Sequence, residues 1–249
     1  MKNSLLRFAR RFLSVSTRRK IVRLTRMPPV GLVGFGNLRR LKPISSSWGT
    51  ERGSPVDRYY IEQFLVQNAQ DIHGRVLEVG DDTYTRQYGG GRVSQSEVLH
   101  VAEQKAKVTI IGDLASGTGI ASDAYDCVIL TQTLQCIFDV AAALRTVHRI
   151  LKTGGIALIT VPGISKISRY DMDHWGYYWS FTTQSMHRLL ETAFPPACVR
   201  VQAHGNVLAS VAFLHGLAYE ELRKKELDYF DPDYELLITA RVEKPPQAE

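Results

Sequence analysis

The residues best suited to chemistry are Glu78 and Gly80, which close the apolar run of Val76, Leu77 and Val79. Such a run suits a strand that is buried on both faces. A carboxylate at the end of that strand can accept hydrogen bonds from a polar cationic ligand, and a glycine lets the backbone turn sharply and lets a ligand come close. An ordinary polar turn after the first strand of an α/β domain would look the same, so the stretch alone leaves both interpretations open.

Other polar side chains stand in the same kind of place, directly after a short apolar run. They are Glu103, which follows Ala102 after the run 98–101, Asp113 after 108–111, and Thr131 and Gln132 after 125–130. Parallel strands place their carboxyl ends at one edge of a sheet, and ligands bind in the crevice beyond that edge. Four polar loops that converge on one edge therefore favour a ligand site more than any one of them does.

A second group of reactive side chains lies in residues 165–182, after the last of these runs. Asp173 or His174 can take a proton from an acceptor hydroxyl, and aromatic faces suit a sugar ring or a cation. The aromatic neighbours are Tyr170, Trp175, Tyr177, Tyr178 and Trp179. The alternative is that Trp175 and Trp179 only close the domain edge and that His174 is a hydrogen-bonded surface residue.

The elements that position these groups alternate between strand and helix. Strands are predicted at 76–79, 98–101, 108–111, 125–130, 156–161, 199–203 and 236–242, and helices at 57–67, 140–151, after Thr182 and at 206–223, with a charged connector at 224–234. Asp57 and Thr182 are the expected N-caps of two of the helices. The alternation predicts a parallel sheet with helices on both faces.

The order of these motifs resembles that of class I S-adenosylmethionine-dependent methyltransferases. The segments that carry the similarity are 76–80, 112–114, 125–130, 144–151 and the turn Lys152-Thr153-Gly154-Gly155 into the apolar run 156–162. The similarity covers about residues 57–195 and is closest to small bacterial type-11 and type-12 methyltransferases, which are often tied to surface-glycan pathways. It implies a Rossmann-like, seven-stranded doubly wound sheet that is mostly parallel with the last strand antiparallel.

The resemblance also implies roles for the residues at the strand ends. Glu78 and Gly80 would line the methionine end and the ribose of the cofactor, Asp113 and Leu114 would bind the adenine, and Thr131 and Gln132 would lie near the sulfonium and the acceptor. Two positions depart from the family pattern. The loop after Gly80 has one glycine where the family has three, and the carboxylate that grips the ribose falls at Glu103, one residue beyond its usual place.

Charge is distributed unevenly along the chain. Residues 1–50 hold 12 of the 31 Lys and Arg residues and none of the 25 Asp and Glu residues, so residues 51–249 carry a net charge of −6. The basicity therefore belongs to the N-terminal arm, which argues against a nucleic-acid footprint spread over the fold. Residues 4–24 can form a basic amphipathic helix on an anionic membrane surface, and they also resemble an organelle transit segment or a solvated basic arm.

Three further observations argue against a dinucleotide site, a metal site and a membrane-spanning helix. The run 30–39 contains a near-copy of a dinucleotide-binding fingerprint, but Arg39 stands at its third glycine and no ribose-binding acid follows, so a linker is the better interpretation. Cys127, Cys136 and Cys198 show no metal-ligand spacing, and reduced buried thiols are expected. No apolar run reaches the length of a transmembrane helix.

Together these observations predict a methyltransferase that transfers a methyl group from S-adenosyl-L-methionine to a small molecule or glycan at oxygen, with His174 and Asp173 as catalytic candidates and no metal. The expected organisation is a basic arm and linker (1–45), one domain (46–243) and a flexible tail (244–249). The expected location is the cytoplasm, either free or at the inner face of a membrane that residues 1–26 contact. Two alternatives stay open: a ligand-binding relative without methyl transfer, and a membrane-surface scaffold in glycan assembly.

Overall fold

A computed structural model describes residues 33–102 and 108–246, together with residues 14, 16, 17, 21 and 28. The chain divides into two compact units, 1–42 and 43–249. In the first, residues 33–42 contain the short 3-10 turn η1 (Gly36–Leu38). The predicted basic helix, residues 4–24, lies almost entirely outside the described residues. Glu103 also lies outside them. Within the described residues, none of the helices has the length and apolar character needed to cross a membrane.

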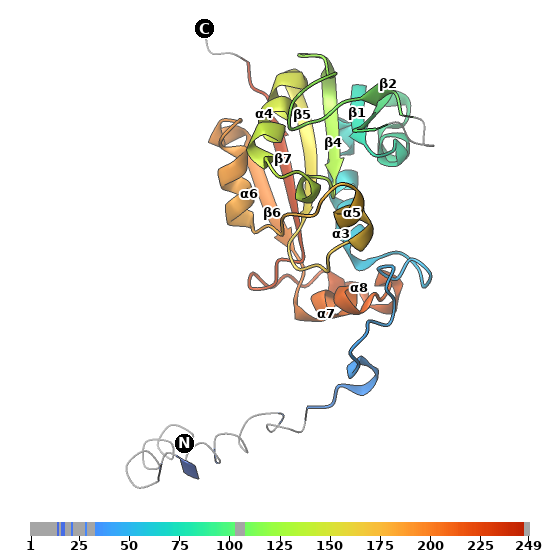
Figure 1. The fold of residues 1–249 in the computed structure, drawn as a ribbon, viewed down its shortest axis with the longest axis vertical. Coiled ribbons are helices and arrows are strands. Elements are labelled where there is room, and N and C mark those ends of the chain that lie inside the picture. The colour runs from blue at the N-terminus through green and yellow to red at the C-terminus, as the bar shows by residue number, and fades with distance from the viewer. Residues whose placement is uncertain are drawn as a thin grey trace. The chain divides into compact units, whose positions relative to one another are not determined.

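The second unit is built on a seven-stranded sheet with the order β3-β2-β1-β4-β5-β7-β6 (Figure 1). The strands are β1 (Gly74–Val79), β2 (Val93–His100), β3 (Ile110–Ile111), β4 (Tyr125–Thr131), β5 (Leu151–Pro162), β6 (Val199–His204) and β7 (Leu237–Glu243). The first five strands pair in parallel, and β7 runs antiparallel to both of its neighbours, β5 and β6. The predicted mostly parallel, Rossmann-like sheet with an antiparallel last strand is confirmed.

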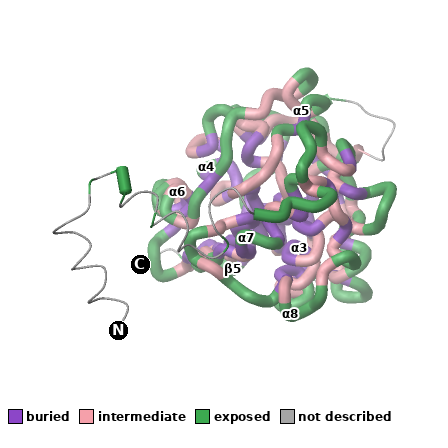
Figure 2. Tube along the Cα trace, turned by 90° about the horizontal axis from the view of Figure 1, so that it is seen from below, coloured by how far each residue is buried: buried purple, intermediate pink, exposed green. Residues whose placement is uncertain are grey.

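Helices cover both faces of this sheet. They are α3 (Val56–Gln67), α4 (Val140–Ile150), α5 (Arg169–His174), α6 (Thr183–Leu190), α7 (Val207–His215) and α8 (Lys224–Leu227). Side chains alternate along each strand, so Leu77 of β1 faces the core that α4 and α6 cover, whereas its neighbour Val76 faces the core beneath α3 and α7. The buried segments lie inside the second unit between these layers (Figure 2).

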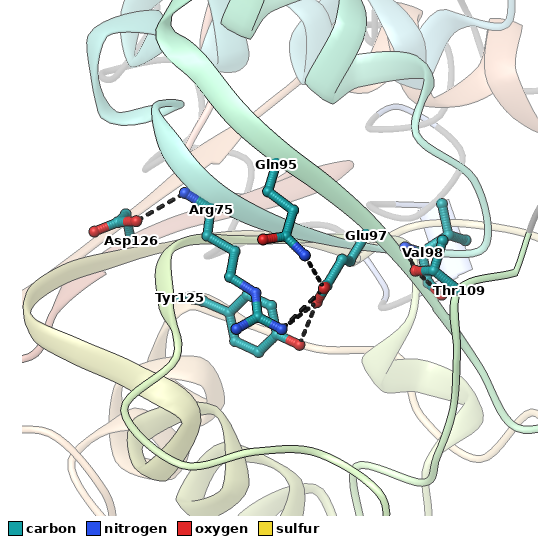
Figure 3. Close-up of polar contacts among 7 residues, drawn as sticks. All are labelled: Arg75, Gln95, Glu97, Val98, Thr109, Tyr125 and Asp126. Carbon is teal, nitrogen blue, oxygen red and sulfur yellow. Dashed lines mark hydrogen bonds and ion pairs between the residues drawn. The ribbon is translucent and has the colours of Figure 1, made fainter.

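A cluster of polar side chains ties β1, β2 and β4 together (Figure 3). The Glu97 carboxylate accepts hydrogen bonds from the Arg75 guanidinium at 2.9 and 3.1 Å, from the Tyr125 hydroxyl at 2.7 Å and from the Gln95 amide at 2.6 Å. The guanidinium also lies 5.0 Å from the centre of the Tyr125 ring. Glu97 is only 8% exposed, and its partners offset the cost of burying its charge. None of these residues lines either of the two cavities described below.

Removing this carboxylate is expected to destabilise the domain without affecting ligand binding. Glu97→Ala leaves a guanidinium, a phenol and an amide without their shared partner and should cost about 2 kcal/mol of unfolding free energy. Tyr125→Phe, which deletes one donor only, should cost about 1 kcal/mol. Urea unfolding measures both values. A Glu97→Ala protein as stable as the parent would show that the cluster contributes nothing to folding.

Helix ends depart from the predicted ones at three places. The predicted helix 206–223 is wrong beyond His215, because Gly216 adopts a left-handed conformation (φ +68°) that ends α7 and lets the chain pack against Ser45. Part of the predicted connector 224–234 is helical instead, as α8. Asp57 is not an N-cap, since α3 begins at Val56. The N-cap prediction for Thr182 is confirmed, with a reciprocal capping box to Ser185.

Candidate functional site

Two cavities open at the carboxyl ends of the parallel strands. The first, of about 540 Å³, is lined by the ends of β1 to β4, by residues 136–138 and by Asp171, His174, Trp175 and Tyr178. The second, of about 810 Å³, is lined by α3, by the loop after β1 and by Ser165, Lys166, Ser168, Tyr170, Asp171 and Tyr177. Both volumes are typical of small-molecule sites. The cavities share four lining residues, namely Val79, Thr131, Gln132 and Asp171.

The first cavity brings together most of the ligand residues predicted from the sequence. Gly80, Asp113, Leu114, Thr131, Gln132 and His174 all line it. Glu78 lines the second cavity instead. Asp173 lines neither cavity, because its side chain is 55% exposed and bonded to the Arg169 guanidinium at 2.7 Å.

Gly80 gives the first cavity an open stretch of backbone. Its φ is +95°, which side-chain-bearing residues rarely adopt, and its N–H donates to the Leu99 carbonyl at 3.1 Å. A Cβ placed on Gly80 would meet no atom within 4 Å, so the space it would fill is free. A ligand group can therefore approach the backbone at this point although the loop contains a single glycine.

The Glu78 carboxylate holds the loop that follows. It accepts hydrogen bonds from the backbone N–H groups of Tyr84 (3.2 Å) and Thr85 (2.8 Å) and from the Thr85 hydroxyl (2.7 Å). These bonds start a short helical turn, the π-helix η3 (Thr85–Gly89). Glu78 is 2% exposed, and this burial raises the pKa of its carboxyl to about 7 in spite of the three donors.

Asp113 and Leu114, which follow β3, form one wall of the first cavity. The Asp113 carboxylate accepts the backbone N–H groups of Ala115 (2.9 Å) and Ser116 (3.2 Å), which fixes the turn. Leu114 is buried beneath this turn. The wall therefore offers a carboxylate and main-chain groups to a ligand in positions that the fold determines.

Gln132 marks the point where the two cavities meet. It has a positive φ of +50°, which is uncommon for a residue with a side chain and is typical of functional sites. Its N–H donates to the Thr160 carbonyl at 2.9 Å, and its carbonyl accepts the Gln135 side-chain amide at 2.7 Å. These bonds hold the end of β4 in this conformation.

An aromatic wall formed by α5 and the residue after it closes the first cavity. The His174 ring stacks on Tyr170 at 4.1 Å, and Trp175 contacts His100 edge-on at 5.0 Å. His100 is the last residue of β2, so an imidazole stands beside the place where the sequence led us to expect a carboxylate. Sequence reasoning missed His100 as a site residue, although the predicted strand 98–101 contained it next to its carboxyl end.

Sequence reasoning also missed Asp57 and Gln135 in the second cavity. Each has one buried side-chain oxygen without a hydrogen-bond partner. A signal for Asp57 was present, because it lies three and four residues before Tyr60 and Ile61 and so belongs to the buried face of α3. No comparable pattern surrounds Gln135, whose position depends on the 3-10 turn η5 (Leu134–Cys136).

Comparisons with known proteins agree with this architecture. A family model described as "Methyltransferase domain" (Methyltransf_23) matches residues 57–194, more than half of the chain. No curated protein matches the chain.

Solved structures share the fold at low identity. Phosphoethanolamine N-methyltransferase 2 of Haemonchus contortus, in complex with S-adenosyl-L-methionine, is 15% identical with a TM-score of 0.50. The match covers 85% of this chain and 55% of that one, so this chain spans about half of that protein. A SAM-dependent methyltransferase from Archaeoglobus fulgidus is 13% identical with a TM-score of 0.49, and 75% of this chain and 94% of that one are covered. By its family match and its fold, the chain belongs to the Methyltransf_23 family of methyltransferase domains and is a class I S-adenosylmethionine-dependent methyltransferase.

Proposed function

We propose that this methyltransferase methylates an oxygen atom of a small molecule or glycan. The observation that carries the proposal is the meeting of two cavities at Thr131, Gln132 and Asp171. One cavity is bounded by strand ends and suits a nucleoside-containing cofactor. The other is bounded by helices and loops and is free for a second ligand. Their junction is where a group can pass from one ligand to the other.

The residues of the first cavity fit S-adenosylmethionine. Gly80 leaves the close approach that such a cofactor needs, and the space a Cβ would fill there is free. Asp113 and Leu114 would hold the adenine, and Thr131 and Gln132 would face the sulfonium end. The bound cofactor supplies a methyl group on a positively charged sulfur, which is a good leaving group. Such a transfer needs alignment and exclusion of water more than covalent catalysis.

Asp171 is the group at the junction that is best placed to receive the acceptor's proton. Its backbone is fixed on both sides, because its N–H donates to the Ser168 hydroxyl (3.2 Å) and its carbonyl accepts the Trp175 N–H (2.7 Å). As the acceptor oxygen bonds the methyl carbon, its proton can pass to this carboxylate. Asp171 thus takes the role that the sequence suggested for Asp173, whose carboxylate is bonded to Arg169.

His174 is the second candidate for proton transfer. Its Nδ1 lies 2.7 Å from the Tyr170 carbonyl oxygen, so the hydrogen-bond pattern assigns the proton to Nδ1 and leaves Nε2 as an acceptor. The imidazole lines the first cavity only, whereas Asp171 lines both. We therefore rank Asp171 above His174.

Two measurements test this function. The purified protein should bind S-adenosylhomocysteine in a calorimetric titration, and it should transfer labelled methyl groups to hydroxyl compounds in a panel of sugars, phenols and amines. Asp171→Asn should lower the turnover roughly 100-fold, the lower range for loss of a general base, with unchanged affinity for S-adenosylhomocysteine. Asp173→Asn, its matched control, should leave both values unchanged.

The outcomes separate the alternatives. Binding of S-adenosylhomocysteine without methylation of any panel compound would favour a ligand-binding relative over an enzyme. Methylation confined to amines would reject transfer to oxygen. A contact of residues 1–26 with an anionic membrane surface and a cytoplasmic location stay predictions from the charge of the sequence.

A further inference from the structure

We infer that Asp57 and Gln135 form an acceptor-binding subsite in the second cavity, which recognises an uncharged sugar ring by accepting hydrogen bonds from its hydroxyl groups. The inference rests on the proposed function, because it names the acceptor of that same site. It is carried by two unpaired buried oxygens in the wall of the second cavity, by the position of one of them beside the junction of the two cavities and by the charge of the cavity wall.

Asp57 provides the first of these oxygens. It is the second residue of α3 and is 8% exposed, yet it lines the second cavity, and its Oδ1 has no hydrogen-bond partner. A buried carboxylate oxygen without a donor is costly, and native proteins rarely keep one without a reason. The burial also raises the pKa of the Asp57 carboxyl. A ligand that donates a hydrogen bond here would remove this cost.

Gln135 provides the second oxygen, close to the junction. Its Nε2 donates to the Gln132 carbonyl at 2.7 Å, which fixes the orientation of the amide and leaves Oε1 as the free end. Oε1 is buried without a partner, and the residue is 4% exposed. Because Gln132 lines both cavities, a hydroxyl bound to Gln135 would lie near the end of β4, where the cavities meet.

Asp171 and Tyr177 line the second cavity as well. Burial raises the pKa of the Tyr177 phenol. Four separate segments of the chain, α3, η5, α5 and the loop after α5, thus contribute side chains to the wall of this cavity.

The charge of the wall excludes an anionic acceptor. Five carboxylates line the second cavity, those of Asp57, Glu62, Glu78, Asp81 and Asp171, against the two cations Arg58 and Lys166. The Arg58 guanidinium donates to the Tyr84 hydroxyl at 3.2 Å, and the Lys166 ammonium lies 3.4 Å from the centre of the Trp48 ring and donates to the Ser46 carbonyl at 2.6 Å. Both cations are therefore already engaged within the described part of the chain.

The same wall suits neutral hydroxyls. A charged group would lose its hydration on entering the cavity, whereas a hydroxyl loses much less. Hydroxyls donate to unpaired oxygens without carrying a charge. The cavity also exposes aromatic rings, those of Trp48, Tyr84, Tyr170 and Tyr177, and aromatic faces suit the apolar faces of a sugar ring.

Methyl transfer to defined compounds tests the subsite. Labelled S-adenosylmethionine is incubated with the full-length protein and three panels: neutral methyl glycosides (a hexose, a deoxyhexose and an N-acetylhexosamine), amines (ethanolamine and a primary amino sugar) and anions (glucuronate and phosphoethanolamine). We expect turnover with at least one neutral glycoside. Asp57→Asn and Gln135→Leu should each raise the KM for that glycoside at least tenfold, and both variants should bind S-adenosylhomocysteine as the parent does.

Asp173→Asn is the matched control, because it makes the same chemical change at a carboxylate that lines neither cavity. It should change the KM less than threefold. The melting temperature of the Asp57→Asn protein should also be no lower than that of the parent. The substitution removes a buried charge whose Oδ1 has no hydrogen-bond partner to lose. A lower melting temperature would mean that Asp57 is structural and would overturn its role in the subsite.

The remaining outcomes distinguish the two proposals. Turnover with the amines or anions alone would overturn the sugar assignment and leave methyl transfer intact. Turnover with a neutral glycoside that neither Asp57→Asn nor Gln135→Leu affects would overturn the subsite only. If S-adenosylhomocysteine binds and no panel compound is methylated, both the proposed function and the subsite are rejected.

Discussion

Gly80→Val is expected to abolish the binding of S-adenosylhomocysteine while the protein stays folded. The substitution places three carbon atoms in space that the first cavity leaves open beside the end of β1. It also forces a β-branched residue to a φ of +95°, a conformation that costs about 1–3 kcal/mol for a residue with a side chain. We expect a loss of affinity of roughly 100-fold or more, which corresponds to about 2.7 kcal/mol of binding free energy.

Gly154 offers a matched control for the effect of backbone strain. It also has a positive φ (+76°) and open space at its Cβ position, but it lines neither cavity. Gly154→Val should therefore lower the melting temperature as Gly80→Val does and leave the affinity unchanged. Isothermal titration and thermal melting measure the two quantities. Equal affinities of the Gly80→Val protein and the parent would show that the cofactor does not approach this backbone.

The second large effect concerns the pH dependence of stability, to which Glu78 and His204 contribute with opposite sign. Burial raises the pKa of Glu78 to about 7 in the folded protein, from an ordinary value of 4.5. The folded state then binds more protons than the unfolded state between these values. The contribution of Glu78 is complete below pH 4.5 and is lost as the pH rises through 7, a change of about 3 kcal/mol.

His204 behaves in the opposite way. Burial lowers the pKa of its imidazole from 6.5 to about 4, and the ring stacks on Tyr60 at 5.6 Å with Nε2 lying 3.0 Å from the Thr239 hydroxyl. The folded state therefore binds fewer protons between pH 4 and 6.5. The contribution of His204 is complete above pH 6.5 and is lost as the pH falls through 4, again by about 3 kcal/mol.

Two variants separate these contributions. In the parent the contributions of Glu78 and His204 oppose each other between pH 4.5 and 6.5 and largely cancel. His204→Gln should become more stable as the pH falls from 6.5 to 4.5, and Glu78→Gln should become less stable over the same range. Urea unfolding at several pH values measures the slopes. Parallel pH profiles for the two variants would contradict the burial of one or both groups.

The sheet could be predicted from the sequence because its strands are short apolar runs that are buried on both faces. The run 125–130 is an example: every residue of it except Asp126 is fully buried, and it forms most of β4. The start of β2 was missed for the opposite reason. Residues 93–97 are mostly polar, all of them but Glu97 are partly or fully exposed, and they extend the strand only because β1 lies beside them.

One part of the candidate site could likewise be predicted from the sequence, and the other part could not. The cofactor edge was predictable, because parallel strands bring their ends together whatever lies between them, so Gly80, Asp113 and Gln132 meet in one cavity. The acceptor cavity was not, because it depends on how α3 and residues 165–177 fold back over that edge. Asp57 was taken for a helix cap from its position in the sequence alone. Its spacing to Tyr60 and Ile61 already indicated the buried face of α3, but the length of chain that folds over this face could not be read from the helix alone.

The two cavities share only four lining residues. The acceptor specificity of such an enzyme can therefore evolve largely independently of its cofactor binding. Substitutions in α3 or at Ser165, Lys166, Ser168, Tyr170 and Tyr177 alter what the second cavity admits, while the residues that line only the first cavity are left as they are. Acceptor range can then drift, or be redirected by design, without loss of the methyl donor. Val79, Thr131, Gln132 and Asp171 are the exceptions, and a library that aims at new acceptors should hold these four constant.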